Sequence, residues 1–567
     1  MAAKKRRAPQ ADKPRQNTPL LFLLLVLIPL YGGYYNFSAL LAGVALAPLL
    51  LYTVWRAGAL RLPAGPEAWC LYALLVCTLL TTPFAVSAGM AAVGVLRLAV
   101  WVLFFLYAAT YTPRERQDIL DVVAYEGAIL SLAAIVGFLY NNAMGIEDAN
   151  GRIDGFFEYA NTWSLFLLVC LILLAMKEER RVADWPAMAC LLLGVYLSGS
   201  RGVFLLLLPL ALVWGVHRLA RRRDVKTVAL AAGGLILIGG AATLLSGGLV
   251  LDRLRAITLS SSSLNGRLLY YLDGLNMLLR HPLGLGRGGY LYIQPLEQTG
   301  VYTLRYIHNG YLQAALDGGI PAGVCMVGLC AAMLFRKGVP ARERAVVFAI
   351  AAHALIDFDF QFTAVAFLLL LCGSGGRYKE IALPRRVVSA RVCACLTLAL
   401  GYFSLIYYLD FSGRPAAAYA LFPADLSLAE NRLQSFDSVE KAQPVADAIL
   451  SSTDLSMLAW DCKFAAAAQR ADLPEMVKDK YQYLRLNRYR GEVYEEFTEL
   501  LENACVQGSP EELVQYRALA QAVILQMEEV NRNTSPLAYR IADKPELDFT
   551  AQLLPRLNQV AERIDMP

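Results

Sequence analysis

Long apolar runs separated by short polar segments make up most of the first 409 residues of the chain. A helix that crosses a membrane needs about 20 mostly apolar residues. The pattern predicts thirteen such helices, at residues 20–35, 37–55, 67–86, 89–111, 118–140, 157–176, 184–199, 202–217, 227–246, 309–335, 343–358, 361–373 and 392–409. The two pairs at 184–217 and 343–373 are short and tightly joined, which puts the expected number of spans at about 12–13.

The pattern changes after residue 409. Ala, Leu and Glu dominate residues 410–567, and breaks at Pro, Gly and Asp divide them into stretches of about 12–20 residues, which predicts helices joined by short turns. Residues 416–423 resemble the end of a tetratricopeptide-like unit. We therefore expect an all-α protein. A polytopic transmembrane helical bundle in residues 20–409 is followed by a helical, tetratricopeptide-like domain in residues 410–567.

Composition supports this division and excludes other classes. Of the 567 residues, 57% are hydrophobic and only 17% are charged, whereas soluble domains are about 45–50% apolar and about 25% charged. This excludes a water-soluble multidomain protein, a disordered chain and a small disulfide scaffold. Residues 1–409 hold 36 Lys and Arg against 22 Asp and Glu, a net charge of +14, whereas residues 410–567 hold 16 against 25, a net charge of −9. The membrane part is therefore basic and the last part acidic.

The basic loops predict the orientation of the chain, because Lys and Arg concentrate in cytoplasmic loops. Residues 1–19 hold six basic residues, Lys4, Lys5, Arg6, Arg7, Lys13 and Arg15. This basic N-terminus is therefore expected in the cytoplasm. Alternation of thirteen spans then places every heavily basic loop on the same side, leaves residues 247–308 as a large loop outside, and sends the domain 410–567 outside as well.

Arginine is the only basic residue expected on the outer side before residue 410. All seven lysines of this part fall inside, whereas eight arginines fall outside, namely Arg152, Arg201, Arg253, Arg255, Arg267, Arg280, Arg287 and Arg305. One interpretation is that long loops escape the positive-inside rule. The other is functional, because the planar guanidinium binds phosphate oxygens with two hydrogen bonds and stays charged near lipid. Such a set suits a lipid-linked phosphate or pyrophosphate.

Two of the arginines stand out by position. Arg201 lies in the tight link between two short spans, where a charge is costly unless it faces a polar cavity or partner. The adjacent Ser200 adds a hydroxyl donor. The alternative for Arg201 is a side chain that extends to the membrane surface from a helix end. Arg97 lies within the fourth span, and an arginine inside the membrane is a functional candidate by default.

Three motifs occur in a fixed order in the second half of the membrane part. They are Ser198-Gly199-Ser200-Arg201-Gly202 before an apolar span, Asn265-Gly266-Arg267 before a helix with His281-Pro282 and Gly284-x-Gly286, and His308-Asn309-x-Tyr311-Leu312-Gln313 before Gly318-Gly319-Ile320. Together they resemble the O-antigen ligase family, which includes O-antigen polymerases and O-oligosaccharyltransferases. The resemblance covers roughly residues 185–375, and His353-x-x-Ile356-Asp357-Phe358 resembles a later element of some members.

The resemblance implies a GT-C-type glycosyltransferase that needs no metal or other cofactor. Such enzymes transfer a glycan from undecaprenyl pyrophosphate to an acceptor hydroxyl, at the outer face of the bacterial cytoplasmic membrane. By motif, the two pyrophosphate-binding arginines map to Arg201 and Arg267, and the essential histidine maps to His308. Arg253, Arg255 and Arg287 compete with Arg267, and we keep Arg287 as a third candidate pyrophosphate ligand.

The residue types fit this reaction. A histidine with a pKa near about 6.5 takes the proton of a sugar hydroxyl as it attacks, and fixed guanidinium groups stabilise the charge that builds on the departing pyrophosphate. The alternative for His308 is a capping or core histidine at the start of a span, next to Asn309. His353 and Asp357 are expected on one helix face, where they form a supporting hydrogen bond near the outer surface rather than a metal site.

Two other functions fit the same pattern. A transporter or flippase for lipid-linked glycans also needs many spans and outer arginines, and a membrane-anchored helical-repeat scaffold would use the domain 410–567. That domain either recruits a protein partner on a concave surface or packs as a cap over the outer face. The expected surroundings are membrane lipid, a glycan donor and a glycan, lipid or protein acceptor, without nucleic acid. The motifs fit a ligase and a polymerase equally.

Overall fold

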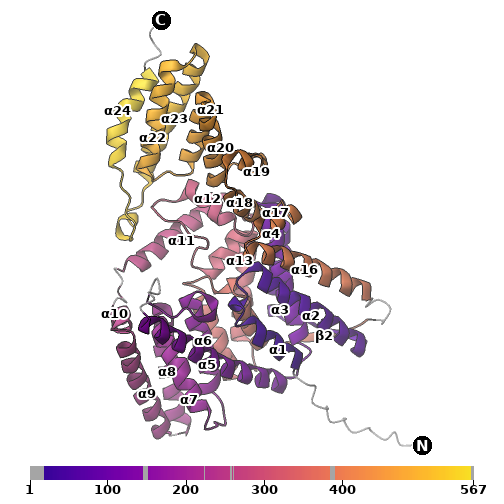
Figure 1. The fold of residues 1–567 in the computed structure, drawn as a ribbon. Helices are drawn as coiled ribbons and strands as arrows, with labels where there is room; N and C mark the ends of the chain where they lie inside the picture. The colour runs from indigo at the N-terminus through magenta and orange to yellow at the C-terminus, as the bar shows by residue number, and fades with distance from the viewer. Residues whose placement is uncertain are drawn as a thin grey trace, which may run out of the picture.

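The computed structural model describes residues 18–144, 151–222, 224–255, 258, 261–383 and 390–562. Regular structure in this part of the chain is almost entirely helical, which confirms the predicted all-α fold (Figure 1). Nearly all of the predicted basic N-terminus, residues 1–17, lies outside the described residues.

Each of the thirteen predicted spans overlaps a helix. The first nine helices are α1 (Thr18–Leu27), α2 (Asn36–Ala57), α3 (Pro66–Thr81), α4 (Ala88–Ala108), α5 (Pro113–Ala143), α6 (Ala160–Ala175), α7 (Asp184–Ser198), α8 (Arg201–Arg222) and α9 (Val225–Leu245). The next seven are α10 (Leu249–Arg255), α11 (Ser262–Arg280), α12 (Gly289–Glu297), α13 (Gly310–Phe335), α14 (Ala341–His353), α15 (Thr363–Gly373) and α16 (Ala390–Phe411).

Not all of these helices are long enough to cross a membrane alone. In the described part of the chain, eight segments are sufficiently long and apolar, on α2, α3, α4, α5, α8, α9, α13 and α16. Three further apolar helices, α6, α7 and α15, are shorter. The multi-pass prediction is therefore confirmed. Although they are short, α15 and most of α6 are buried at the centre of the bundle. One antiparallel ribbon joins β1 (Ala59–Pro63) to β2 (Tyr378–Ala382).

Glycines bring the loop after α11 against the middle of α13. Gly284 has a φ of +88°, and a Cβ there would lie 2.4 Å from the backbone nitrogen of Gly319, itself at φ +83°. The backbone N–H of Leu285 donates to the carbonyl of Leu316 at 2.7 Å. Only glycine allows both the left-handed backbone and this close approach. The loop that precedes α12 is thereby fixed to the bundle.

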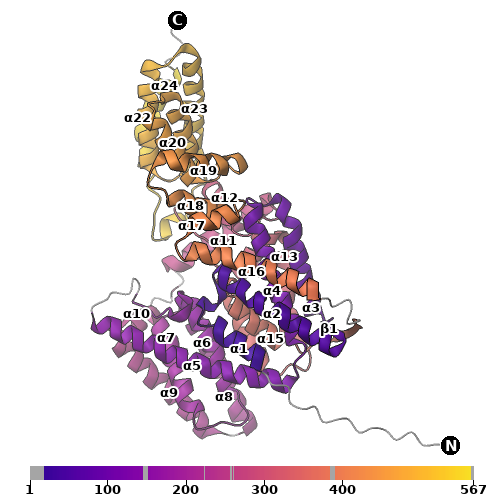
Figure 2. The same cartoon turned by 45° about the vertical axis from the view of Figure 1, so that its right-hand side comes forward.

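Residues 415–562 form a column of helices above the bundle (Figures 1 and 2). They are α17 (Pro415–Leu421), α18 (Leu426–Gln434), α19 (Val439–Ser452), α20 (Met457–Gln469), α21 (Leu473–Arg485), α22 (Gly491–Gln507), α23 (Pro510–Asn533) and α24 (Asp548–Glu562). Consecutive helices from α19 to α22 pack as neighbours, as helical hairpins do. A tetratricopeptide repeat remains a prediction.

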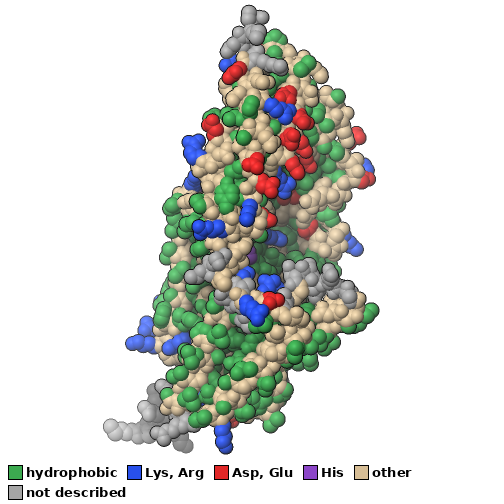
Figure 3. All heavy atoms as spheres, turned by 90° about the vertical axis from the view of Figure 1, so that its left-hand side faces the viewer, with side chains coloured by type: hydrophobic (Ala, Val, Ile, Leu, Met, Phe, Trp, Pro, Cys, Tyr) green, Lys and Arg blue, Asp and Glu red, His purple; other side chains and the backbone are tan. Residues whose placement is uncertain are grey.

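Several contacts hold this column on the bundle. Tyr407 of α16 donates to Asp425, and Tyr292 of α12 donates to Glu430 at 2.8 Å. Farther up, Arg488 donates to the carbonyl of Leu296 at 2.6 Å. Acidic side chains gather on the column and hydrophobic ones on the bundle, and Lys and Arg side chains border a hollow between the two (Figure 3).

Candidate active site

A buried carboxylate, Asp357, lies at the centre of the site. Helix α14 ends at His353, and the chain turns before the short 3₁₀ helix Asp359–Gln361. The carboxylate of Asp357 accepts hydrogen bonds from the hydroxyl of Tyr159 at 2.9 Å and from the amide of Asn161 at 2.8 Å. The guanidinium of Arg267 lies 3.6 Å from it. Because its side chain is only 1% exposed, these partners are what keep the charge inside the protein.

His308 faces this carboxylate. Its Nδ1 lies 3.4 Å from Oδ1 of Asp357 and 3.5 Å from the hydroxyl oxygen of Tyr159. A carboxylate beside Nδ1 favours a proton on that nitrogen and leaves the lone pair on Nε2, the state a general base requires. The His308 side chain is 21% exposed, so its ring is within reach of a substrate.

The backbone around His308 is constrained. The residue has a φ of +53°, which is unfavourable for a side chain with a Cβ. Tyr271 of α11 donates to the His308 carbonyl at 2.6 Å. Asn309 caps α13 by accepting from the N–H of Tyr311 at 3.0 Å, and it donates to the carbonyl of Leu355 at 3.0 Å. Strain held by such contacts is typical of functional positions.

A cavity of about 100 Å³ adjoins Asp357 on one side, and arginines dominate its lining. They are Arg152, Arg201, Arg253 and Arg267, which meet Asn161, Ser200, His353 and Asp357. Arg201 begins α8 two residues after Gly199, which caps the C-terminal end of α7 with a φ of +61°, and the side chains of Arg152 and Arg253 pack against that glycine. Four cations around one carboxylate leave this cavity strongly electropositive.

Polar atoms in this cavity remain available to a ligand. The hydroxyl of Ser200 and the Nε of Arg267 are buried and make no hydrogen bond within the described structure. Arg152, by contrast, is held by the carbonyl of Ser198 at 2.6 Å and by Asn161 at 2.8 Å. Burial, followed by the nearby Arg253, lowers the pKa of Arg152 to about 10, so it stays charged at neutral pH and favours an anion beside it.

His353 does not pair with Asp357, so the prediction that the two share a helix face is wrong. Since α14 ends at His353, Asp357 lies in the following turn. His353 instead contacts Asp359 through Nδ1 at 2.7 Å, and both side chains are buried. Thr162 also donates to Asp359, at 2.8 Å. The His353 ring packs against Gly202 next to Arg201 and lines the arginine cavity.

Arg97 and Arg287 belong to a different cluster. Arg97 is 4% exposed and donates to the backbone carbonyls of Gly33 and Gln361 at 3.1 and 2.6 Å. Arg287 donates to the side chain of Gln361 at 2.6 Å. Both line a cavity of about 60 Å³ with Asp317. Arg287 was expected to bind pyrophosphate together with Arg201 and Arg267, but the structure does not bring it to these two residues.

A larger cavity of about 310 Å³ opens on the other side of Arg267. His308, Arg267, Tyr270, Ser262 and Ser263 line it together with three residues that precede α24, Ile541, Ala542 and Asp543. Ser263 accepts from Arg267 at 3.0 Å. Arg267 thus borders both cavities, whereas His308 borders only this one.

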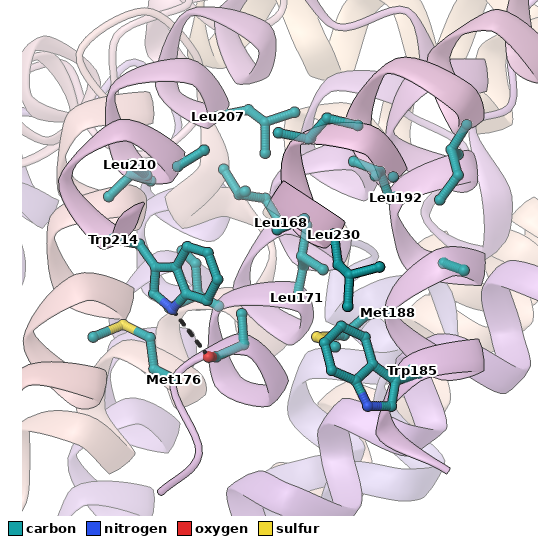
Figure 4. A pocket seen from close by; sticks show the side chains of 18 of the residues that line it. Leu168, Leu171, Met176, Trp185, Met188, Leu192, Leu207, Leu210, Trp214 and Leu230 are labelled. Atoms are coloured by element: carbon teal, nitrogen blue, oxygen red, sulfur yellow. Dashed lines mark hydrogen bonds between the residues drawn. The ribbon is translucent and has the colours of Figure 1, made fainter. Parts of the chain in front are cut away.

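A third cavity, of about 270 Å³, is apolar and lies among α6, α7, α8 and α9. Leucines from these helices line it, with Trp185 and Trp214 at one end (Figure 4). The indole of Trp214 donates to the carbonyl of Ala175 at 3.2 Å, so this polar group is satisfied. Such a lining suits a hydrocarbon chain rather than a polar ligand.

The residues that hold Asp357 from the other half of the bundle were missed by sequence reasoning. Tyr159 and Asn161 belong to no motif in the chain, and only their position at the outer end of a predicted span could have indicated them. Arg152 and Arg253 were recognised as outer arginines but not as neighbours of Arg201. Among the described residues, no group of three or more His, Cys, Asp and Glu side chains could hold a metal ion.

In the described part of the chain, eight membrane-length helices and a histidine–carboxylate pair beside an arginine-lined cavity define a multi-pass membrane protein with a cationic site. Residues 186–327 match the family model described as O-antigen ligase, and this match confirms the family that the motifs indicate. The matched region is therefore similar to glycosyltransferases of the O-antigen ligase and polymerase type. The matched region contains Arg201, Arg267 and His308, while Asp357 lies beyond it. No curated protein and no solved structure matches the chain.

Proposed function

We propose that the chain transfers a glycan from undecaprenyl pyrophosphate to an acceptor hydroxyl, with His308 as the general base. The observation that carries this proposal is the position of the His308–Asp357 pair between an arginine-lined cavity and a cavity large enough for a sugar. In this account the pyrophosphate lies among Arg152, Arg201 and Arg267.

The reaction then follows from the positions of the groups. The acceptor hydroxyl oxygen attacks the anomeric carbon of the donor sugar, and its proton passes to Nε2 of His308. The bond between that carbon and the pyrophosphate oxygen breaks, and the lipid pyrophosphate leaves with the bonding electrons. Its growing negative charge is stabilised by the fixed guanidinium groups and by the Ser200 hydroxyl.

Asp357 positions the base rather than reacting. Its carboxylate orients the imidazole through Nδ1 and stabilises the imidazolium that forms when Nε2 takes the proton. Tyr159 and Asn161 hold the carboxylate by hydrogen bonds. His353 lines the arginine cavity and is itself held by Asp359. The arginines supply the positive charge that the leaving group needs, so the proposed reaction uses no metal.

The apolar cavity suits the hydrocarbon part of the donor. Helix α8 begins at Arg201 and contributes Leu207, Leu210 and Trp214 to that cavity. At 1.5 Å per residue these positions lie roughly 9–20 Å along the helix from Arg201. A lipid whose pyrophosphate lies among the arginines can therefore place its chain along α8.

The proposal also includes the orientation of the chain in the membrane and the limits of its domains. The basic N-terminus 1–19 lies in the cytoplasm, residues 20–409 form the membrane domain, and residues 247–308 with the domain 410–567 lie outside. The site then faces the outer surface of a bacterial cytoplasmic membrane. Arg97 and Arg287 brace the bundle beside the site through Gln361 rather than binding pyrophosphate.

The proposal is tested with the full-length protein in lipid vesicles supplied with an undecaprenyl-pyrophosphate-linked glycan and extracts that contain acceptors. We expect release of undecaprenyl pyrophosphate together with a glycosylated product. Movement of the labelled lipid across the bilayer without a glycosylated product would contradict the proposal and support a transporter. Transfer that persists after removal of residues 412–567 would exclude a purely scaffolding role.

A further inference from the structure

The chain segment between α23 and α24 returns from the helical column to the membrane bundle. The N–H of Ser535 donates to the carbonyl of Thr299 at 2.9 Å. The 3₁₀ helix Ala538–Arg540 then packs against α11, and Ala538 and Ile541 form a buried apolar cluster with Leu269 and Tyr302. A Cβ on Gly300 would meet Ala538 at 2.8 Å. The contact is therefore close-packed, as in a protein interior.

This fixed segment supplies one wall of the cavity beside His308. Ile541, Ala542 and Asp543 face the side formed by Tyr270 and Arg267. The volume of about 310 Å³ falls within the range of about 300–1,000 Å³ that is usual for small-ligand sites. Because this cavity contains both His308 and residues 541–543, the acceptor side of the site depends on the C-terminal part of the chain.

The lining carries one cation, Arg267, and one carboxylate, Asp543, and it favours a hydroxyl-rich ligand without net charge. The exposed carboxylate of Asp543 accepts hydrogen bonds from hydroxyl groups, the hydroxyls of Ser262 and Ser263 donate or accept them, and Tyr270 presents an aromatic ring. The Asp543 carboxylate repels phosphate. A pyrophosphate is therefore favoured in the arginine cavity, whereas sugar rings are favoured here.

We propose that residues 535–543 form the outer wall of an acceptor subsite, and that Asp543 binds hydroxyl groups of an acceptor glycan. This inference rests on the proposed function, in which His308 takes the proton of the acceptor hydroxyl. It assigns the C-terminal domain a direct part in acceptor selection. A change in this segment would alter which glycan is accepted without altering the donor.

The test measures glycan binding directly, without transfer. The full-length protein in nanodiscs is applied to immobilised oligosaccharides of varied sequence, and the variants Asp543→Ala and Asp543→Asn are compared with Glu546→Ala. Glu546 is exposed on the same segment and does not line the cavity. We expect the wild type to bind at least one oligosaccharide and Glu546→Ala to bind it with the same affinity. Both Asp543 variants should bind it with an affinity at least about tenfold lower, the loss expected for a charge-assisted hydrogen bond.

The outcomes separate this inference from the proposed function. Equal binding by Asp543→Ala and the wild type would overturn the proposed subsite. Binding of the wild type to an acceptor peptide but to none of the oligosaccharides would overturn it as well. Loss of binding in Arg201→Ala with full binding in Asp543→Ala would place the glycan in the arginine cavity and also overturn it. If binding depends on Asp543 but no glycan is ever transferred, the proposed function fails while the glycan site stands.

Discussion

The Nδ1 atom of His308 lies 3.4 Å from Oδ1 of Asp357, which joins the loop before α13 to the turn after α14. The same carboxylate contacts Tyr159 at the start of α6 and Arg267 of α11. One buried charge thus ties together four separate parts of the chain. It connects the expected base, His308, to the arginine cavity.

Replacing Asp357 tests the positioning of the base. In Asp357→Asn the amide no longer carries the charge that stabilises the imidazolium, so we expect kcat to fall by roughly 10²–10⁴-fold, the usual contribution of general acid–base catalysis. Steady-state transfer assays on the purified protein would separate kcat from the KM for donor. An unchanged kcat would remove Asp357 from this role.

Arg152 is predicted to hold the donor although no motif contains it. Arg152→Ala removes a guanidinium from the arginine cavity, and loss of one charge-assisted hydrogen bond should lower kcat/KM for the donor by about 10–100-fold. Arg280→Ala is the matched control, because Arg280 is another outer arginine whose side chain is 68% exposed and pairs with Glu297. Equal losses in the two variants would point to a general effect of outer charge instead.

The close approach of Gly284 to Gly319 predicts a steric effect on folding. Gly284→Ala adds a Cβ at 2.4 Å from the Gly319 nitrogen, so the loop before α12 must shift. Gly413→Ala provides the comparison, because Gly413 also has a positive φ, +77°, but a Cβ there meets nothing within 4 Å. We expect Gly413→Ala to cost about 1 kcal/mol of stability from backbone strain alone, and Gly284→Ala to cost clearly more. Thermal unfolding in detergent would compare them, and equal Tm values would refute the packing argument.

Asp479 makes the helical column sensitive to pH. Both carboxylate oxygens are buried without a hydrogen-bond partner in the described structure, and burial, with the nearby Glu475, raises the pKa to about 6. A raised folded-state pKa means that the folded protein binds more protons than the unfolded one between about pH 4 and 6, so stability falls as pH rises through this window.

Asp479→Asn should therefore stabilise the column above pH 6, by roughly 1–2 kcal/mol, and the gain should vanish near about pH 4. Hydrogen exchange of α21 in the full-length protein, corrected for the intrinsic rate, would measure this difference at both pH values. A stabilisation of equal size at the two pH values would show that the charge of Asp479 is not its cause.

The helical fold and the three motifs that contribute residues to the site could be predicted from the sequence. Arg201, Arg267 and His308, read from separate motifs, lie around Asp357, because the motif positions fall at helix ends on one face of the bundle. Hydropathy predicted a short helix at 361–373, but it could not tell that α15 and α6 are buried, since a central helix and a spanning helix have the same apolar composition.

The errors have a common physical cause. His353 and Asp357 are four residues apart, which suggests one helix face, but α14 ends at His353 and its partner becomes Asp359. Arg287 resembles the other outer arginines in sequence, yet its loop is fixed against α13 and directs it to Gln361. Such partners depend on tertiary contacts between distant segments, which spacing along the chain does not contain.

The most direct test of the proposed reaction is transfer by His308→Ala compared with the wild type, with donor binding measured on the same samples. We expect the variant to bind the undecaprenyl-pyrophosphate-linked glycan as the wild type does, because the arginine cavity is intact, while glycan transfer falls to background. Transfer at the wild-type rate by His308→Ala would contradict the assignment of His308 as the base and, with it, the central claim.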